Sequence, residues 1–117
     1  MNRALSSLKG NDAFREVFRK GRHLSDGALV LCIKENETGD IRLGVMMSKK
    51  CGNSVVRHRF SRIVRESVRL RRLQFLRGAD LVVFTKKDRR FLHPKDLTFA
   101  ATDHALLLLL RRAHFVG

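Results

Sequence analysis

Runs of apolar residues and their spacing predict that helices and strands alternate along this chain. Residues 28–33 are continuously apolar, as in a strand covered on both faces, and in residues 41–48 apolar positions recur at every second residue. A third strand is predicted at 81–85. Helical patterns occupy residues 11–20, the stretch from 54 to about 76, and 97–110. The pattern favours a small domain that combines helices with a sheet.

Residues with known preferences mark the ends of the helices. Asn11 is the expected N-cap of the first helix, and Gly21 is its expected stop. Asn53 or Ser54 is expected to cap the second helix, which Gly78 terminates. Because the chain has 117 residues and neither repeats nor a linker, we expect one domain spanning 1–117.

The second helix separates apolar from cationic positions. At 100° per residue, one side carries Val56, Phe60, Ile63, Val64 and Ser67. The other side carries Arg57, His58, Arg62, Arg65, Arg69 and Arg72, with Arg59 at the flank. Between positions 49 and 77 there are eight arginines and one acid, Glu66, whereas a merely solvated helix face mixes both signs. Since a guanidinium can bind phosphate through two hydrogen bonds, this face is predicted to bind phosphate.

The two other helices each allow two interpretations. Phe14, Val17 and Phe18 share one face of the first helix, which is either part of the core or, beside several cations, a platform for stacked bases. The apolar run 105–110 in the last helix favours burial against the sheet. A membrane or partner-helix face is the minority alternative, because the run is far shorter than the ~20 residues that span a bilayer.

Charge narrows the choice of partner. Twenty-five Lys and Arg against eleven Asp and Glu give a net charge of +14, which indicates a polyanionic partner.

Cys32 and Cys51 lack the spacing of a zinc site or a redox pair, and the N-terminal residues lack the apolar core of a signal peptide. We therefore expect a cytoplasmic protein with reduced thiols and no membrane contact.

The sequence contains no recognisable active site. Its carboxylates are scattered, its histidines lack metal-ligand spacing, and it has no glycine-rich phosphate loop. We expect no catalytic and no metal-binding residue in the chain. The residues alone thus indicate a small nucleic-acid-binding module.

One long motif resembles a known family. Residues 48–66 are similar to the signature of the bacterial ribonuclease P protein subunit, through Lys49-Lys50, Gly52-Asn53, Arg57-His58-Arg59, Arg62 and Arg65-Glu66. Residues 8–21, 42–45 and 80–85 also resemble that family's first helix, second strand and last strand. The sequence departs from the pattern at His58, where the family has Asn, at Ser61, where a basic residue is usual, and at Cys32, where an aromatic is common.

The resemblance implies a fold and two sites. The fold is α+β, a single-domain α-β-β-β-α-β-α sandwich with a left-handed βαβ crossover, like the second domain of ribosomal protein S5. It includes one strand that the hydrophobic pattern does not reveal. The implied contacts to the catalytic RNA subunit are Lys49, Lys50, Asn53, Arg57, Arg59, Arg62 and Arg65, to which the cationic helix face adds His58 and Arg69. The implied contacts to the single-stranded 5′ leader of precursor tRNA are Phe14, Phe18, Val30 and Cys32.

The resemblance also implies an activity. The protein would be the accessory subunit of the endoribonuclease that matures tRNA 5′ ends, with catalysis in the RNA subunit and magnesium held by that RNA. Its partners would be the RNA subunit and precursor tRNA, not DNA. Two alternatives stay open at this point: a ribosomal or general RNA-binding module without catalysis, and a freestanding nuclease.

Overall fold

A five-stranded mixed sheet organises the computed structural model, which describes residues 3–117. The strand order is β1-β4-β5-β3-β2. The central strand, β5, runs antiparallel to β3 and parallel to β4. The strands are β1 (Leu5–Ser7), β2 (Arg22–Asp26), β3 (Leu29–Glu35), β4 (Ile41–Met46) and β5 (Ala79–Thr85).

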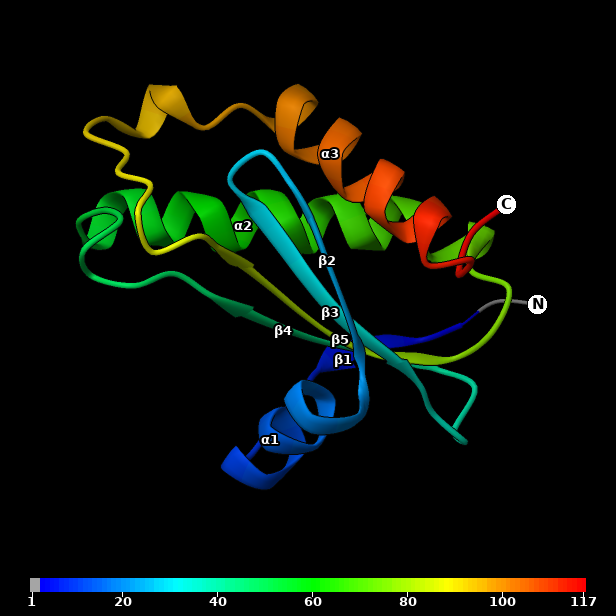
Figure 1. Cartoon of the computed structure of the whole chain (residues 1–117). Coiled ribbons are helices and arrows are strands. Elements are labelled where there is room, and N and C mark those ends of the chain that lie inside the picture. The colour runs from blue at the N-terminus through cyan, green and yellow to red at the C-terminus, as the bar shows by residue number, and fades with distance from the viewer. Residues whose placement is uncertain (1–2) are drawn as a thin grey trace.

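Helices cover the sheet unequally. One face is covered by α1 alone, and the other by α2 and α3 together (Figure 1). The helices are α1 (Asn11–Lys20), α2 (Ser54–Arg71) and α3 (Phe99–Arg112), and single 3₁₀ turns are η1 (Arg72–Gln74) and η2 (Pro94–Asp96). Helix α2 connects the parallel neighbours β4 and β5, so the predicted crossover between parallel strands is present.

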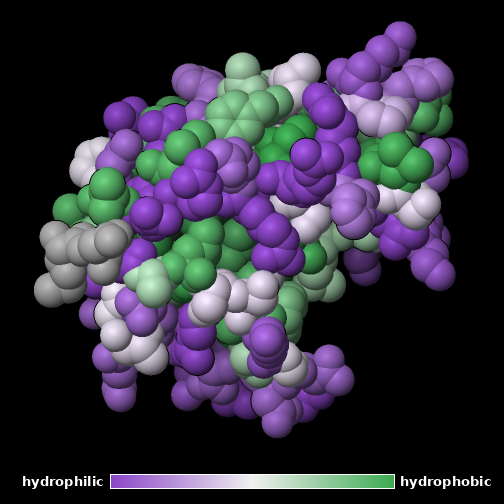
Figure 2. All heavy atoms as spheres, turned by 180° about the vertical axis from the view of Figure 1, so that it is seen from behind, coloured by the Kyte–Doolittle hydropathy of each residue, from purple (hydrophilic) through white to green (hydrophobic). Residues whose placement is uncertain are grey.

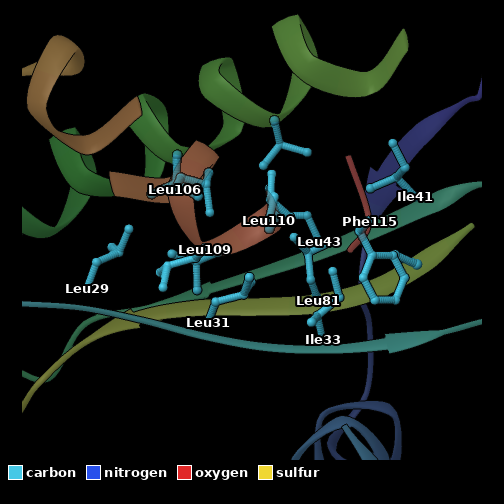
Figure 3. Close-up of a cluster of buried hydrophobic side chains, with 14 of the residues drawn as sticks. Leu29, Leu31, Ile33, Ile41, Leu43, Leu81, Leu106, Leu109, Leu110 and Phe115 are labelled. Atoms are coloured by element: carbon cyan, nitrogen blue, oxygen red, sulfur yellow. The ribbon is translucent and has the colours of Figure 1, made fainter. Parts of the chain in front are cut away.

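Strand alternation divides the buried side chains into two clusters. Leu31 and Ile33 of β3, together with Leu81 of β5, point toward α2 and α3, where Leu109 and Leu110 pack against them (Figure 3). On the α1 side a smaller cluster consists of Leu8, Val17, Cys32 and Val82. The arrangement therefore buries α2 and α3 deeply, whereas α1 has a single fully buried residue, Val17.

The structure confirms the α+β class and adds two strands to the pattern-based prediction. The three predicted helices and the strands at 28–33, 41–47 and 81–85 are all present. Strand β2, which only the resemblance implied, and the short β1 complete the sheet. The apolar run of α3 is buried through Leu106, Leu109 and Leu110, as the favoured interpretation required. Within residues 3–117 no helix has the length and apolarity needed to cross a membrane.

Two of the predicted helix ends are corrected, and one is confirmed. Asn11 is the first residue of α1 rather than its cap, because Gly10, with φ 91°, occupies the cap position and no side-chain cap hydrogen bond forms. Gly21 does end α1, but its φ of −78° is ordinary. Glycine is needed there because a Cβ would lie 2.5 Å from the Val17 carbonyl oxygen. Helix α2 ends at Arg71, and η1 continues the chain.

The predicted faces of α2 are largely correct. The buried positions are Val56, Phe60, Ile63, Val64, Ser67 and Val68. Arg57 was predicted on the exposed face, but it is only partly exposed and its Nε is buried. The physical reason is its angular position, which falls between the buried residues Val64 and Val68 on the helix wheel.

Candidate nucleic-acid interface

The outer face of α2 presents exposed basic side chains along about three helical turns. His58, Arg62, Arg65 and Arg69 are all exposed and recur at helical spacing. Because Asn53 caps the helix, accepting a 3.0 Å hydrogen bond from the Val56 N–H, the face begins at a fixed register. We call these four residues the α2 outer face.

Two arginines of this face are held in place by neighbours. Arg65 donates from Nε to the Ser61 hydroxyl at 3.1 Å and from Nη1 to the Ser7 hydroxyl of β1 at 3.2 Å. Arg69 forms two hydrogen bonds with Glu66, at 3.1 and 2.5 Å. The Arg69–Glu66 pair is exposed and holds the pKa of Glu66 below its usual value through the hydrogen bond from Arg69. β1 and these arginines together line a hollow of about 410 Å³.

Arg57 is partly buried, and Arg59, although exposed, is tied to the protein through its Nε. Arg59 donates from Nε to the Leu97 carbonyl oxygen at 2.8 Å, which ties α2 to the segment before α3. The buried Arg57 Nε has no hydrogen-bond partner among residues 3–117. Each therefore has less freedom to meet a phosphate than the residues of the α2 outer face.

Two basic loops, far apart in sequence, form one end of the molecule. Lys49 and Lys50 are exposed in the loop before α2. The Cys51 carbonyl oxygen accepts a hydrogen bond from the Phe91 N–H at 2.6 Å, and the Cys51 thiol donates to the Lys86 carbonyl oxygen at 3.4 Å. The loop 86–92 therefore adds its own cations, Lys86, Lys87, Arg89 and Arg90, to the predicted site. We call this end the joined loops.

Aromatic side chains gather on the opposite face of the sheet. Phe14 and Phe18 of α1 and Val30 of β3 are partly exposed. The Phe18 ring meets the Phe84 ring of β5 edge to face, with 6.0 Å between centroids. Rings that keep part of their surface open beside a sheet can receive a base by stacking. We give the name α1 cleft to the surface of Phe14, Phe18, Val30 and Phe84, after the leader-binding cleft that the resemblance implies.

Cys32 does not reach the surface of the α1 cleft. Its side chain is fully buried beneath α1, and burial raises the pKa of the thiol to about 11. The His23 ring links it to α1, because Nδ1 lies 3.2 Å from the Cys32 sulfur and Nε2 lies 2.9 Å from the Phe18 carbonyl oxygen. Cys32 thus supports the cleft from below, and a direct contact between its thiol and RNA would require α1 to move.

Comparison with known proteins decides the family. The model of the family described as Ribonuclease P matches residues 2–114. The chain belongs to the ribonuclease P protein family. The ribonuclease P protein component of Lachnoclostridium phytofermentans is 42% identical over 80 residues, which cover 68% of this chain and 69% of that protein. That of Alkaliphilus metalliredigens is 34% identical over 112 residues, 96% of each chain.

Solved ribonuclease P proteins share the fold. The Staphylococcus aureus RNase P protein has a TM-score of 0.80 and 26% identity, with 98% of this chain and 100% of that chain covered. The expectation drawn from residues 48–66 is thereby confirmed at the level of family and fold. A ribosomal or general RNA-binding module is not favoured.

The structure brings most of the predicted ribonuclease P residues together in two separate places. The α2 outer face and the joined loops contain Lys49, Lys50, Asn53, His58, Arg62, Arg65 and Arg69. The α1 cleft contains Phe14, Phe18 and Val30. Seen from behind, hydrophilic side chains cover much of the surface, with apolar patches between them (Figure 2).

Sequence reasoning missed three residues of these surfaces. Phe84 could have been found from the alternation of β5, which places it on the same face as Val82. Ser7 and His23 lie on short, polar strands with no apolar period, and only the strand pairing reveals where they point.

Proposed function

We propose that this ribonuclease P protein binds its RNA subunit with the α2 outer face and the joined loops, and the 5′ leader of precursor tRNA with the α1 cleft. The single observation that carries this proposal is the placement of the two surfaces. Helix α2 lies on one side of the sheet and α1 on the other, so one protein can contact two RNA strands at once (Figure 1).

The chemistry of the α2 outer face suits a folded RNA. Arg62, Arg65 and Arg69 present planar guanidiniums that bind phosphate through two hydrogen bonds, and arginine keeps its charge at every physiological pH. Most of the +14 charge would be neutralised by phosphates in the complex. Lys49 and Lys50 extend the same surface beyond the start of the helix.

The chemistry of the α1 cleft suits a single strand. Phe14 and Phe18 offer ring surface to unpaired bases, which double-stranded RNA cannot present. Arg15 and Arg19 are exposed on the same helix and can meet the backbone of a bound strand. Stacking tolerates any base, so the cleft would accept leaders of different sequence.

The protein would assist catalysis without performing it. Residues 3–117 contain no group of three or more His, Cys, Asp or Glu side chains arranged to hold a metal ion. We propose that magnesium, which activates water and neutralises developing charge in phosphodiester hydrolysis, is held by the RNA subunit. The side chains of this protein then screen phosphates and position the leader.

A reconstitution experiment tests the proposal. Precursor tRNA is incubated at low magnesium with the protein alone, with the RNA subunit alone, and with both. We expect leader removal to be fastest with both and absent with the protein alone. Cleavage by the protein alone would instead support a freestanding nuclease, and an unchanged rate with both would refute the proposed assistance.

A further inference from the structure

A hollow that neither RNA surface uses lies on the α2 and α3 side of the sheet. Its volume is about 260 Å³, and it is lined by the turn between β2 and β3, by β5, by α2, and by the first turns of α3. Leu29, Phe60 and Ala101 contribute apolar walls. Phe91 of the loop 86–92 and Asp96 and Leu97 at η2 complete the lining of this open space beside α3.

A buried hydroxyl without a partner borders this hollow. Thr85 is 4% exposed and follows Leu81 and Val83 on the same face of β5, so its side chain is directed to the α2 and α3 side. Its Oγ1 makes no hydrogen bond with any of residues 3–117. Because a buried polar atom without a partner destabilises the fold, a group bound in the hollow could satisfy it.

Two carboxylates border the same hollow. Neither Asp26 nor Asp96 forms an ion pair within residues 3–117, although the chain carries a large excess of cations. Asp96 accepts one hydrogen bond, at 3.1 Å from the His93 N–H, and Asp26 is partly buried. Asp26 and the exposed Asp96 are the charged residues among those that line the hollow, whereas Arg59 and Arg112 are held nearby on the Leu97 and Ser25 carbonyl oxygens.

We propose that this hollow binds a small amphiphilic amine. The apolar walls would hold its hydrocarbon body, Asp26 and Asp96 its protonated amine, and the Thr85 hydroxyl one further polar group. An apolar cavity of about 150 Å³ takes benzene, so the present volume suits a ring with a short chain. The proposal does not rest on RNA binding, because none of the side chains named for the amine is assigned to an RNA surface, although Phe91 of the joined loops also lines the hollow.

A fluorine NMR titration of the full chain tests the proposal. The probe is 4-fluorophenethylamine, and the matched control is 4-fluorophenylacetate, which has the same ring and the opposite charge. We expect saturable binding of the amine and at least about tenfold weaker binding of the acetate. Equal affinity for the two probes, or no saturation with the amine, would overturn the proposal.

Three variants locate the bound amine. Asp26→Asn should weaken binding about five- to tenfold, whereas Asp12→Asn, which removes the same charge from the exposed surface of α1, should leave the affinity unchanged. Ala101→Phe should block the site by filling its mouth, and since Ala101 is exposed, circular dichroism should show an intact fold. If all three bind the amine as the parent does, the site lies elsewhere and the proposal is wrong.

Discussion

The ring of Phe14 lies directly against the backbone of Gly44. A Cβ built on Gly44 would lie 2.5 Å from Cζ of Phe14 and 2.6 Å from its Cε2, well inside van der Waals contact. Helix α1 can therefore approach β4 only because residue 44 has no side chain. This contact fixes how closely α1 packs on the sheet beside the surface that Phe14 shares with Phe18.

Replacing Gly44 should push α1 away from the sheet. For Gly44→Ala we expect a loss of about 1–3 kcal/mol in the free energy of unfolding, the usual cost of overpacking, and weaker binding of leader-bearing precursor tRNA. Denaturant unfolding and a binding titration measure the two effects. Phe14→Leu in the same chain should restore part of the stability, and strictly additive losses would show that the two residues do not interact.

Removing the Phe18 ring should affect the leader and little else. We expect Phe18→Ala to weaken binding of leader-bearing precursor by about 1–3 kcal/mol per stacked base and to leave mature tRNA affinity nearly unchanged. Binding of both RNAs to the assembled enzyme measures this. Phe99→Ala removes a similarly half-buried ring on the other side of the sheet and serves as the control. Equal losses for both RNAs, with a lowered melting temperature, would assign Phe18 to the core instead.

The α2 outer face should govern the salt dependence of RNA-subunit binding. Arg62→Ala and Arg65→Ala should each weaken binding and reduce the slope of log affinity against log salt concentration by about one. Arg111→Ala, an exposed arginine at the end of α3, is the matched control and should leave the slope unchanged. The assignment fails if the α2 variants bind like the parent at every salt concentration.

The partly buried carboxylate of Asp103, between α2 and α3, should make the free energy of unfolding depend on pH. The Ser67 hydroxyl donates to Asp103 at 2.7 Å, and Arg71 pairs with both oxygens of the carboxylate. Burial pushes the pKa of Asp103 upward, but the hydrogen bonds from Arg71 and Ser67 outweigh it, so the pKa lies below the usual 3.8. Since the charged form is favoured in the folded state, its stabilisation is present above about pH 4 and is lost as pH falls through the lowered pKa.

Asp103→Asn should therefore cost about 1–3 kcal/mol of unfolding free energy at pH 7, and the difference from the parent should shrink below pH 3. Denaturant unfolding at several pH values measures it. Glu66→Gln breaks the exposed Glu66–Arg69 pair within α2 and should change stability little. A constant difference between parent and Asp103→Asn at all pH values would contradict this account.

The Cys32 thiol should be unreactive in the folded protein. Burial raises its pKa to about 11, so at pH 8 almost no thiolate is present to attack an alkylating reagent. Mass spectrometry after mild alkylation should show Cys32 unmodified, and modification should become complete in denaturant. Rapid modification of the folded chain would mean that α1 opens far more readily than its packing indicates.

The regular spacing of apolar residues made most of the helices and strands predictable. The alternation at 41–47 and the long amphipathic pattern of α2 each come from residues that face one large core. β1 and β2 were not predicted because both are edge strands whose side chains are mostly exposed. Such strands show no apolar alternation, and their pairing with β4 and β3 is visible only in the folded sheet.

The RNA-binding residues could be predicted where helical spacing alone determines their positions. They could not be predicted where contacts between distant parts of the chain determine them. The α2 outer face followed from helical spacing alone. That the loop at 49–53 would meet the loop at 86–92 could not be foreseen, since the hydrogen bonds from the Phe91 N–H to Cys51 and from the Cys51 thiol to Lys86 both go to backbone carbonyl oxygens. Likewise, the full burial of Cys32 depends on how closely α1 packs, which the Phe14–Gly44 contact determines.

The strand order has a consequence for synthesis. β5 follows the four other strands of the sheet in chain order, yet it occupies the centre of the sheet and pairs with both β3 and β4. Until residue 85 has emerged, the β2–β3 hairpin and the β1–β4 pair have no shared partner, and each exposes an edge. The nascent chain must therefore keep two incomplete half-sheets apart, and the sheet closes only after β5 has emerged.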